Sequence, residues 1–271
     1  MIVANEDSIG YGRLGKAPAR SHLNALMFSN YAEPIPVLPT ATNFWTDKPE
    51  FPKQSFGNID YSDCTRASQA IAALRMESLE TGQIPSITDE EIERVYFEMT
   101  KKYYGGGDTG ASEMDALNEW RRPDCTFKDT EGNPLAIDAY LRINQANIQE
   151  VKQAMVTAKA HGIKICMNLP IAFSGTLTWD IPIGQQPIGR YQPGSWGGHS
   201  MFTIDYNEFG LIVPTWDTVA YISWNAVANY ADEAYVIIDS IDSWITQVTK
   251  KELNLDAIKS DVNQSSSQKI K

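Results

Sequence analysis

The sequence predicts an α+β protein whose first half is helical and whose second half is rich in strands. Helix-favouring segments with start and stop residues dominate up to about residue 122, and short alternating apolar segments dominate after residue 134. The chain has 271 residues, of which 42% are hydrophobic and 10% aromatic. It is therefore long enough to bury a sizeable core, as one large domain or as two lobes.

Residues 1–56 are expected to form an extended arm that packs on the core. Prolines punctuate the segment, as in AEPIPVLPTAT and KPEFP. Each proline fixes φ and disfavours a helical conformation at the residue before it. One short helix is expected at SHLNALMFSNYA. Three large aromatic residues, Trp45, Phe51 and Phe56, favour packing across a core over a free arm.

The predicted helical lobe spans residues 57–130. Its first helix starts at Cys64 and continues through TRASQAIAALRMESLE. A second helix is expected after Thr88, because Glu91 follows three residues later in a capping-box pattern and a run of three glycines ends the segment. A third helix is expected over SEMDALNEWRR, where apolar residues recur at helical spacing.

The predicted strand-rich lobe spans residues 131–250. It opens with a strand at PLAIDAYLRI, a helix at NIQEVKQAMVTAKAHG and a buried strand at IKICMNLP. After a turn-rich region, further strands are expected at HSMFTIDY, GLIVPTW, TVAYISW and EAYVIID, with a short helix at NAVANYAD. This meander predicts an antiparallel sheet or a partly open barrel. Residues 258–271 are polar and low in complexity, so we expect a disordered tail.

Charge and composition exclude several classes of function. The formal net charge of −11 disfavours nucleic acid as a partner, since phosphate binding needs clustered cations. We expect no membrane association and no secretion signal, because the sequence has neither a long apolar run nor a basic start followed by an apolar segment. The three widely spaced cysteines favour a reducing compartment, although a single disulfide plus one free thiol is the alternative. The spacing of metal-binding residue types predicts neither a metal site nor a cofactor.

Cys64 is the candidate nucleophile. It opens a helix, where unpaired N–H groups and the helix dipole lower the pKa of a thiol; the alternative interpretation is a small buried hydrophobe. A thiol nucleophile needs a histidine as base, and the chain has only His22, His161 and His199. His22 lies in the arm and His161 at a helix end, which leaves His199, preceded by SWGG at the start of a strand, as the candidate base.

The arrangement of these two residues resembles papain-like cysteine peptidases. His199 follows Cys64 by 135 residues, and the catalytic pair of papain-like enzymes is separated by roughly 130 to 150 residues in the same order. A helical half that carries the cysteine and a strand-rich half that carries the histidine also resembles the two-lobed papain fold. The segments GNIDYSDCTRA, GGHSM and VPTWDTVAYISW are similar to uncharacterised papain-like proteins of tailed phages and prophages.

The resemblance implies roles for the residues around the pair. Asn58, six positions before Cys64, corresponds to the glutamine that helps to form the oxyanion hole, and it is one methylene shorter. The backbone N–H of Cys64 would be the second donor. Residues that flank the histidine are expected to bind substrate: Trp196, Gly197, Gly198 and Trp216. For Trp196 the equally frequent alternative is a large loop aromatic that fills the core.

The segment VPTWD departs from the family pattern. Papain-like enzymes have an asparagine two residues before the tryptophan, where its amide orients the imidazole. If Trp216 is that tryptophan, Pro214 takes the asparagine position and has no side-chain donor or acceptor. Thr215 or Asp217 is the expected substitute, with Asp217 preferred because a carboxylate would also stabilise the imidazolium. A dyad without a third member is equally compatible with the sequence.

Two functions from different classes follow. The first is a thiol hydrolase that cleaves peptide or isopeptide bonds, with a cell-wall peptide amide as a variant, and with a peptide or protein as its partner. The second is a catalytically weakened papain-fold structural protein, for instance a virion component that binds other virion proteins. The cytoplasm of a bacterial host or a phage virion is the expected location. The arm would serve as a docking arm or, lying in the cleft, as a propeptide.

Overall fold

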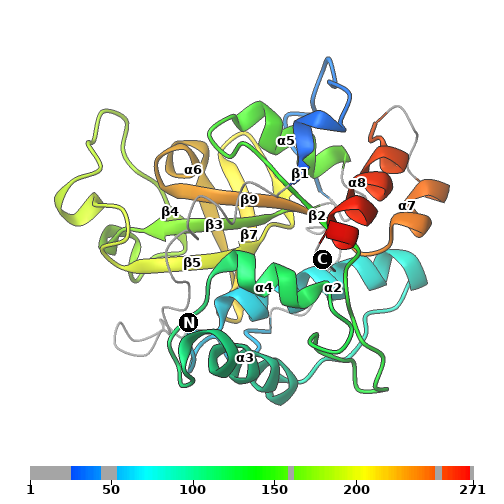
Figure 1. The fold of residues 1–271 in the computed structure, drawn as a ribbon. Coiled ribbons are helices and arrows are strands. Elements are labelled where there is room, and N and C mark those ends of the chain that lie inside the picture. Colours follow the sequence, from blue (N-terminus) through cyan, green and yellow to red (C-terminus); the bar gives the residue numbers. More distant parts are fainter. Residues whose placement is uncertain (1–25, 44–53, 158–161, 248–251, 269–271) are drawn as a thin grey trace.

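The computed structural model gives the arrangement of most of the chain (Figure 1). It describes residues 26–43, 54–157, 162–247 and 252–268. His22, His161, Trp45 and Phe51 lie outside the described residues, as do the start of the helix expected at SHLNALMFSNYA and the end of the helix expected at NIQEVKQAMVTAKAHG.

Three helices form the helical lobe, in which α2 is central (Figure 1). Every residue of α2 from Cys64 to Met76 is buried, and alanines such as Ala70 and Ala72 allow neighbouring elements to approach closely. At the start of α3 the Thr88 hydroxyl accepts the backbone N–H of Glu91, as the capping pattern predicts. The three helices are α2 (Cys64–Thr81), α3 (Asp89–Tyr104) and α4 (Glu113–Trp120).

The strands form two sheets. The order of the five-stranded sheet is β1-β2-β9-β3-β5, and that of the four-stranded sheet is β4-β8-β7-β6. Pairing is antiparallel except between β1 and β2 and between β4 and β8. The first sheet contains β1 (Leu26–Met27), β2 (Ala139–Arg142), β3 (Lys164–Leu169), β5 (Gly197–Phe202) and β9 (Ala231–Ile238). The second contains β4 (Thr178–Trp179), β6 (Asp205–Tyr206), β7 (Gly210–Thr215) and β8 (Thr218–Ser223).

Shorter helices connect and cover these sheets. The helices predicted at NIQEVKQAMVTAKAHG and NAVANYAD are present as α5 and α6. The single strand predicted at HSMFTIDY is divided into β5 and β6. None of the described helices is long and apolar enough to cross a membrane. The remaining helices are η1 (Phe28–Asn30), α5 (Ile148–Thr157), η2 (Ile171–Phe173), η3 (Gly189–Tyr191), α6 (Trp224–Tyr230), α7 (Ile241–Gln247) and α8 (Leu255–Gln268).

The two lobes meet where α2 packs against β5. β5 is the last strand of the five-stranded sheet, so the N–H groups on its outer edge are available to partners outside that sheet. The start of α2 carries Cys64 and β5 carries His199. The fold therefore brings the two candidate catalytic segments to one junction.

The longer of the two described parts of the arm, residues 26–43, lies on the strand-rich lobe; the shorter part is residues 54–56. β1 pairs with β2 at its start, and the next residue, Phe28, is buried. At its other end, the backbone N–H of Thr42 donates to the carbonyl of Tyr206 at 2.8 Å, and the Tyr206 hydroxyl donates to the carbonyl of Pro39 at 2.9 Å. Residues 26–43 do not line the cavity beside Cys64, whereas Gln54 and Ser55, near the end of the arm, do.

The C-terminal segment differs from the disordered tail predicted for residues 258–271. It forms helix α8 through Gln268, because Leu255 and Ile258 are buried and Val262 packs against the core at helical spacing. The hydroxyl of Tyr31 donates to Asp261 at 2.6 Å, which ties this helix to the arm. Low sequence complexity concealed a short apolar stripe that is sufficient to dock the helix.

Candidate active site

Cys64 is the first residue of α2, as predicted, but it is only 1% exposed. As the first helical residue it has a backbone N–H without an acceptor inside the helix. Its sulfur accepts the backbone N–H of Ser200 at 3.4 Å. Ser200 directly follows His199, so the structure places the cysteine against the peptide unit that carries the candidate base.

The imidazole of His199 is held by a contact at Nε2 and by an aromatic ring stacked on its face. Its Nε2 lies 2.9 Å from Oγ1 of Thr215, and the side chain is 3% exposed. The indole of Trp216 stacks on the imidazole with ring centroids 4.3 Å apart and an interplanar angle of 17°. These two contacts define the plane and the direction of the imidazole ring.

The contact with Thr215 reverses the preference for Asp217 as the orienting residue. β7 and β8 are joined by the two residues Trp216 and Asp217, both with positive φ, of 48° and 58°. This is the geometry of a tight hairpin turn, and it directs Asp217 to the surface, where it is exposed. Pro214 stays in the ladder, paired with Val219. Sequence alternation alone did not reveal that the strand ends at Thr215.

The predicted substrate-binding residues lie around the histidine in different ways. Gly197 and Gly198 begin β5 and pair with Leu169 and Asn168 of β3. Trp196 is 7% exposed and contacts the Trp216 ring at a centroid distance of 5.5 Å. In this conformation Trp196 is mostly buried and packs against Trp216, the ring that stacks on His199.

Trp179 completes this aromatic group and was not anticipated from the sequence. Its ring is fully buried and lies 5.8 Å from the Trp216 ring and 6.4 Å from the His199 ring, both edge to face. Edge-to-face geometry of this kind is favourable for aromatic pairs. The only sequence feature that marks Trp179 is its position within the turn-rich stretch before GGH.

Asn58 lines the same small cavity as Cys64. The turn that precedes it has positive φ at Phe56 and Gly57, of 55° and 87°, which carries the chain sharply toward α2. The Asn58 side-chain NH₂ donates to the carbonyl of Tyr61 at 3.1 Å. One of its two N–H bonds is therefore held by that carbonyl, and a role of Asn58 in an oxyanion hole stays a prediction.

The electrostatics of the thiol differ from the sequence expectation of an activated thiolate. Burial raises the pKa of Cys64 from its ordinary value of 9.0 to about 12, and the N–H of Ser200 opposes this change only in part. The preceding residue, Asp63, is also fully buried, and burial raises the pKa of its carboxyl well above the usual range. In this conformation Cys64 is a neutral thiol at neutral pH, because burial raises the thiol pKa by more than the helix N-terminus lowers it.

A buried polar cluster behind Cys64 was also missed by sequence reasoning. Lys164 and Glu113 form an ion pair at 2.6 Å with both side chains at 0% exposure. Lys164 is the one charged residue in the mostly apolar segment IKICMNLP, and this is the feature by which it was detectable.

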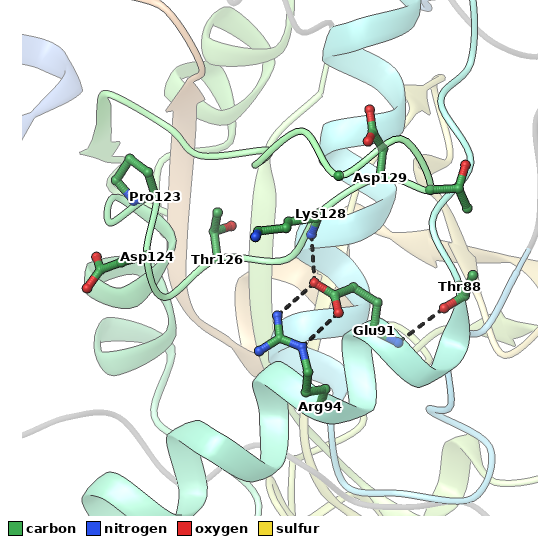
Figure 2. A pocket seen from close by; sticks show the side chains of 10 residues that line it. Thr88, Glu91, Arg94, Pro123, Asp124, Thr126, Lys128 and Asp129 are labelled. Carbon is green, nitrogen blue, oxygen red and sulfur yellow. Dashed lines mark hydrogen bonds and ion pairs between the residues drawn. The ribbon is translucent and has the colours of Figure 1, made fainter.

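A larger cavity lies away from this site. The cavity beside Cys64 has a volume of about 10 Å³, whereas one of about 480 Å³ lies at the start of α3 and along the loop that follows α4 (Figure 2). Figure 2 shows Glu91 at the centre of that polar cavity, bound by Arg94 and by the backbone N–H of Lys128. The described residues include no group of three or more histidine, cysteine or acidic side chains arranged to hold a metal ion.

Comparison with known proteins identifies the fold. No protein-family model matches the sequence, and no curated protein sequence matches it. Among solved structures, Xylellain, a cysteine protease from Xylella fastidiosa, superposes with a TM-score of 0.63 over 89% of this chain and 100% of that one, at 17% identity.

Other solved structures superpose with lower TM-scores. The Carica candamarcensis enzyme in complex with E-64 matches 75% of this chain and 100% of its own length, with a TM-score of 0.55 and 14% identity. The precursor of stem bromelain matches 88% of this chain and 80% of its own length, with a TM-score of 0.51 and 12% identity. The chain therefore has a papain-like α+β fold, which confirms the predicted fold class.

Proposed function

We propose that this protein is a thiol hydrolase that cleaves peptide or isopeptide bonds, with Cys64 as nucleophile and His199 as base. The observation that supports this most directly is the junction at which the Cys64 sulfur contacts the peptide unit of His199 and Ser200, while Thr215 holds Nε2 of the histidine. Because Nε2 is engaged by Thr215, the nitrogen that exchanges a proton with the thiol is Nδ1.

The first half of the reaction transfers the acyl group to sulfur. Nδ1 of His199 accepts the thiol proton as the sulfur attacks the substrate carbonyl carbon, and the carbonyl oxygen becomes an oxyanion. The backbone N–H of Cys64 and the amide of Asn58 donate to that oxygen. The tetrahedral species then collapses, the C–N bond breaks, and the leaving amine takes the proton from the imidazolium.

The second half releases the product. His199 removes a proton from water, the resulting hydroxide attacks the thioester carbon, and the same two donors stabilise the second oxyanion. The C–S bond then breaks, the thiolate takes back the proton from the imidazolium, and a carboxylic acid leaves. Thr215 acts throughout by holding the imidazole plane, as the third residue of other catalytic triads does.

The closed state of the site requires an opening step before substrate binds. Cys64 and His199 are 1% and 3% exposed, and Gln54 and Ser55 line the cavity over the cysteine. The side chain of Gln54 donates to Asp89 at 2.6 Å and so fastens this segment to α3. The opening step would therefore include release of the contact between Gln54 and Asp89. Substrate would then reach the sulfur of Cys64.

The same closure favours a second candidate function. A papain-fold interaction protein, for instance a virion component with weakened catalysis, would keep the fold and need no access to Cys64. The two functions differ in the reactivity of one thiol, which is directly measurable.

The test compares Cys64 with Cys125 inside one molecule. The full chain is treated with iodoacetamide at mildly acidic pH, and alkylation of each cysteine is followed by peptide mass spectrometry. Iodoacetamide reaches Cys64 only in the opened state, in which the burial that keeps the thiol neutral is lost. Hydrolase function therefore predicts that Cys64 reacts faster than Cys125, and that a mixture of quenched peptides is cleaved by the wild type and by Cys125→Ala but not by Cys64→Ala. Equal alkylation rates together with no cleavage would contradict hydrolysis and favour the interaction protein.

A further inference from the structure

A closed network of buried polar groups lies directly behind the candidate nucleophile. Around the ammonium of Lys164 lie a carboxylate oxygen of Glu113 at 2.6 Å, the hydroxyls of Ser68 and Ser200 at 2.8 Å each, and the carbonyl of Thr65 at 3.1 Å. The ion pair is fully buried, and the serine side chains are also buried. A buried charge is stable only when it is paired and hydrogen-bonded. These contacts therefore fix the positions of the side chains in the network relative to one another.

The network touches the nucleophile from two sides. On α2, the Ser68 hydroxyl donates to the carbonyl of Cys64 at 2.6 Å. On β5, the Ser200 hydroxyl donates to Glu113 at 2.7 Å and accepts from Lys164, while the backbone N–H of the same Ser200 donates to the Cys64 sulfur. The side chain of Ser200 is thus clamped by a cation and an anion, and its main chain contacts the sulfur.

The four elements in the network come from both halves of the fold. Ser68 lies on α2 and Glu113 on α4, whereas Lys164 lies on β3 and Ser200 on β5. Glu113 is the first residue of α4, where the helix dipole favours its negative charge. The network therefore fixes the relative position of the helix that carries the nucleophile and the strand that carries the base.

We propose that Glu113, Lys164 and Ser200 are positioning residues that hold the Ser200 N–H against the Cys64 sulfur and so stabilise the thiolate when it forms. This inference rests on the proposed hydrolase function. Lys164 and Glu113 carry opposite charges, so their combined field at the sulfur is small and their contribution is geometric. Removing the clamp lets the Ser200 peptide move, and the thiolate loses a hydrogen bond that is stronger to an anion than to a neutral thiol.

Several other ionisable groups face this region and belong in any interpretation of pH dependence. Asp63 precedes the nucleophile, and His199 precedes Ser200. The Cys166 thiol of β3 donates to Glu113 at 3.3 Å. On β9, Glu233 is paired in register with Cys166 and accepts the Tyr235 hydroxyl at 2.6 Å. These groups remain in place in the variants below.

The experiment measures the iodoacetamide rate of Cys64 against pH in the full chain, with Cys125 as internal reference, together with the melting temperature. Ser200→Ala removes the clamped hydroxyl but keeps the N–H and the ion pair, and Ser200→Thr restores a hydroxyl. The double variant Glu113→Gln/Lys164→Met removes both charges without leaving one unpaired. Lys102→Met is the matched control, because it removes an ion pair to the buried Glu119 elsewhere in the helical lobe.

The expected result is a rate profile displaced toward higher pH in the double variant, with Cys64 about tenfold slower at neutral pH, which corresponds to about one pKa unit. Ser200→Ala should change the rate in the same direction and Ser200→Thr should restore it, while Lys102→Met leaves it unchanged. Variants that lower only the melting temperature and keep the wild-type rate profile would overturn the positioning role. A wild-type Cys64 that reacts no faster than Cys125, together with no peptide cleavage by the wild type, would instead refute the proposed hydrolase, and this inference with it.

Discussion

Thr215 Oγ1 lies 2.9 Å from Nε2 of His199, at the place where a papain-like pattern leads one to expect an asparagine side chain. A hydroxyl can either donate to this nitrogen or accept from it, so it fits both protonation states of the imidazole. The hairpin turn at Trp216 and Asp217 fixes the end of the strand and so aims the hydroxyl. Thr215 is thus the residue of β7 that contacts the candidate base directly before the hairpin turn.

Replacing Thr215 by valine should lower hydrolysis without unfolding the protein. The change keeps the shape of the side chain and removes the hydroxyl, so the imidazole is free to tilt. Because misplacement by about 1 Å can cost about 100-fold, we expect kcat to fall by roughly 10- to 100-fold with a smaller change in KM. Steady-state kinetics on a cleaved peptide measure this. Asp217→Asn is the control, and a larger loss in that variant would return the orienting role to Asp217.

The buried thiol of Cys64 should make stability depend on alkaline pH. The folded chain holds the thiol proton until about pH 12, whereas the ordinary value is 9.0. Stability from the neutral thiol is therefore present below pH 9.0 and is lost as pH rises toward the folded value. The wild type should lose up to about 1.4 kcal/mol per pH unit more than Cys64→Ala in this window. Parallel pH profiles in urea unfolding would rule out a thiol that is buried and neutral.

Asp63→Asn should stabilise the chain at neutral pH. Burial raises the pKa of the Asp63 carboxyl well above its usual range, so stability from its neutral form is present below the ordinary pKa and is lost as pH rises toward the folded pKa. Asparagine has nearly the same shape and no charge. We expect a gain of more than about 1 kcal/mol in the free energy of unfolding at neutral pH, shrinking in acid. Denaturant titrations at acidic and neutral pH give the comparison, and an equal effect at both would show that the carboxyl does not titrate in this range.

Trp179→Ala should be strongly destabilising, because the ring is fully buried between Phe173 and the tryptophans beside His199. Removal of a core tryptophan typically costs about 3–5 kcal/mol. Val37→Ala, at an 84% exposed position, is the control and should change stability by less than about 0.5 kcal/mol. If Trp179→Ala unfolded at the same urea concentration as the control, the aromatic group would not be part of the core.

The order of helices and strands, and the meeting of Cys64 with the His199 segment, were predictable because they depend on local patterns and on one long spacing. That His199 contacts Thr215 and not Asp217 was not predictable, since it depends on where a hairpin turns and on a side chain that meets the histidine only after folding. The pairing of Lys164 with Glu113 joins residues from different lobes, and no local pattern records such a contact. The neutral state of Cys64 follows from burial by segments distant in sequence, which a helix-start motif cannot reveal.

The attachment of α8 to the arm has a consequence for the order in which the protein is built. Ala32 forms a bridge with Leu253, the backbone N–H of Asn254 donates to Tyr31, and the Tyr31 hydroxyl reaches Asp261. During synthesis Tyr31 and Ala32 leave the ribosome long before residues 253–261, so these contacts cannot form until α8 has been made. A nascent chain that stalls before α8 would therefore carry Tyr31 and Ala32 without their partners, and the arm is fastened only once α8 has emerged.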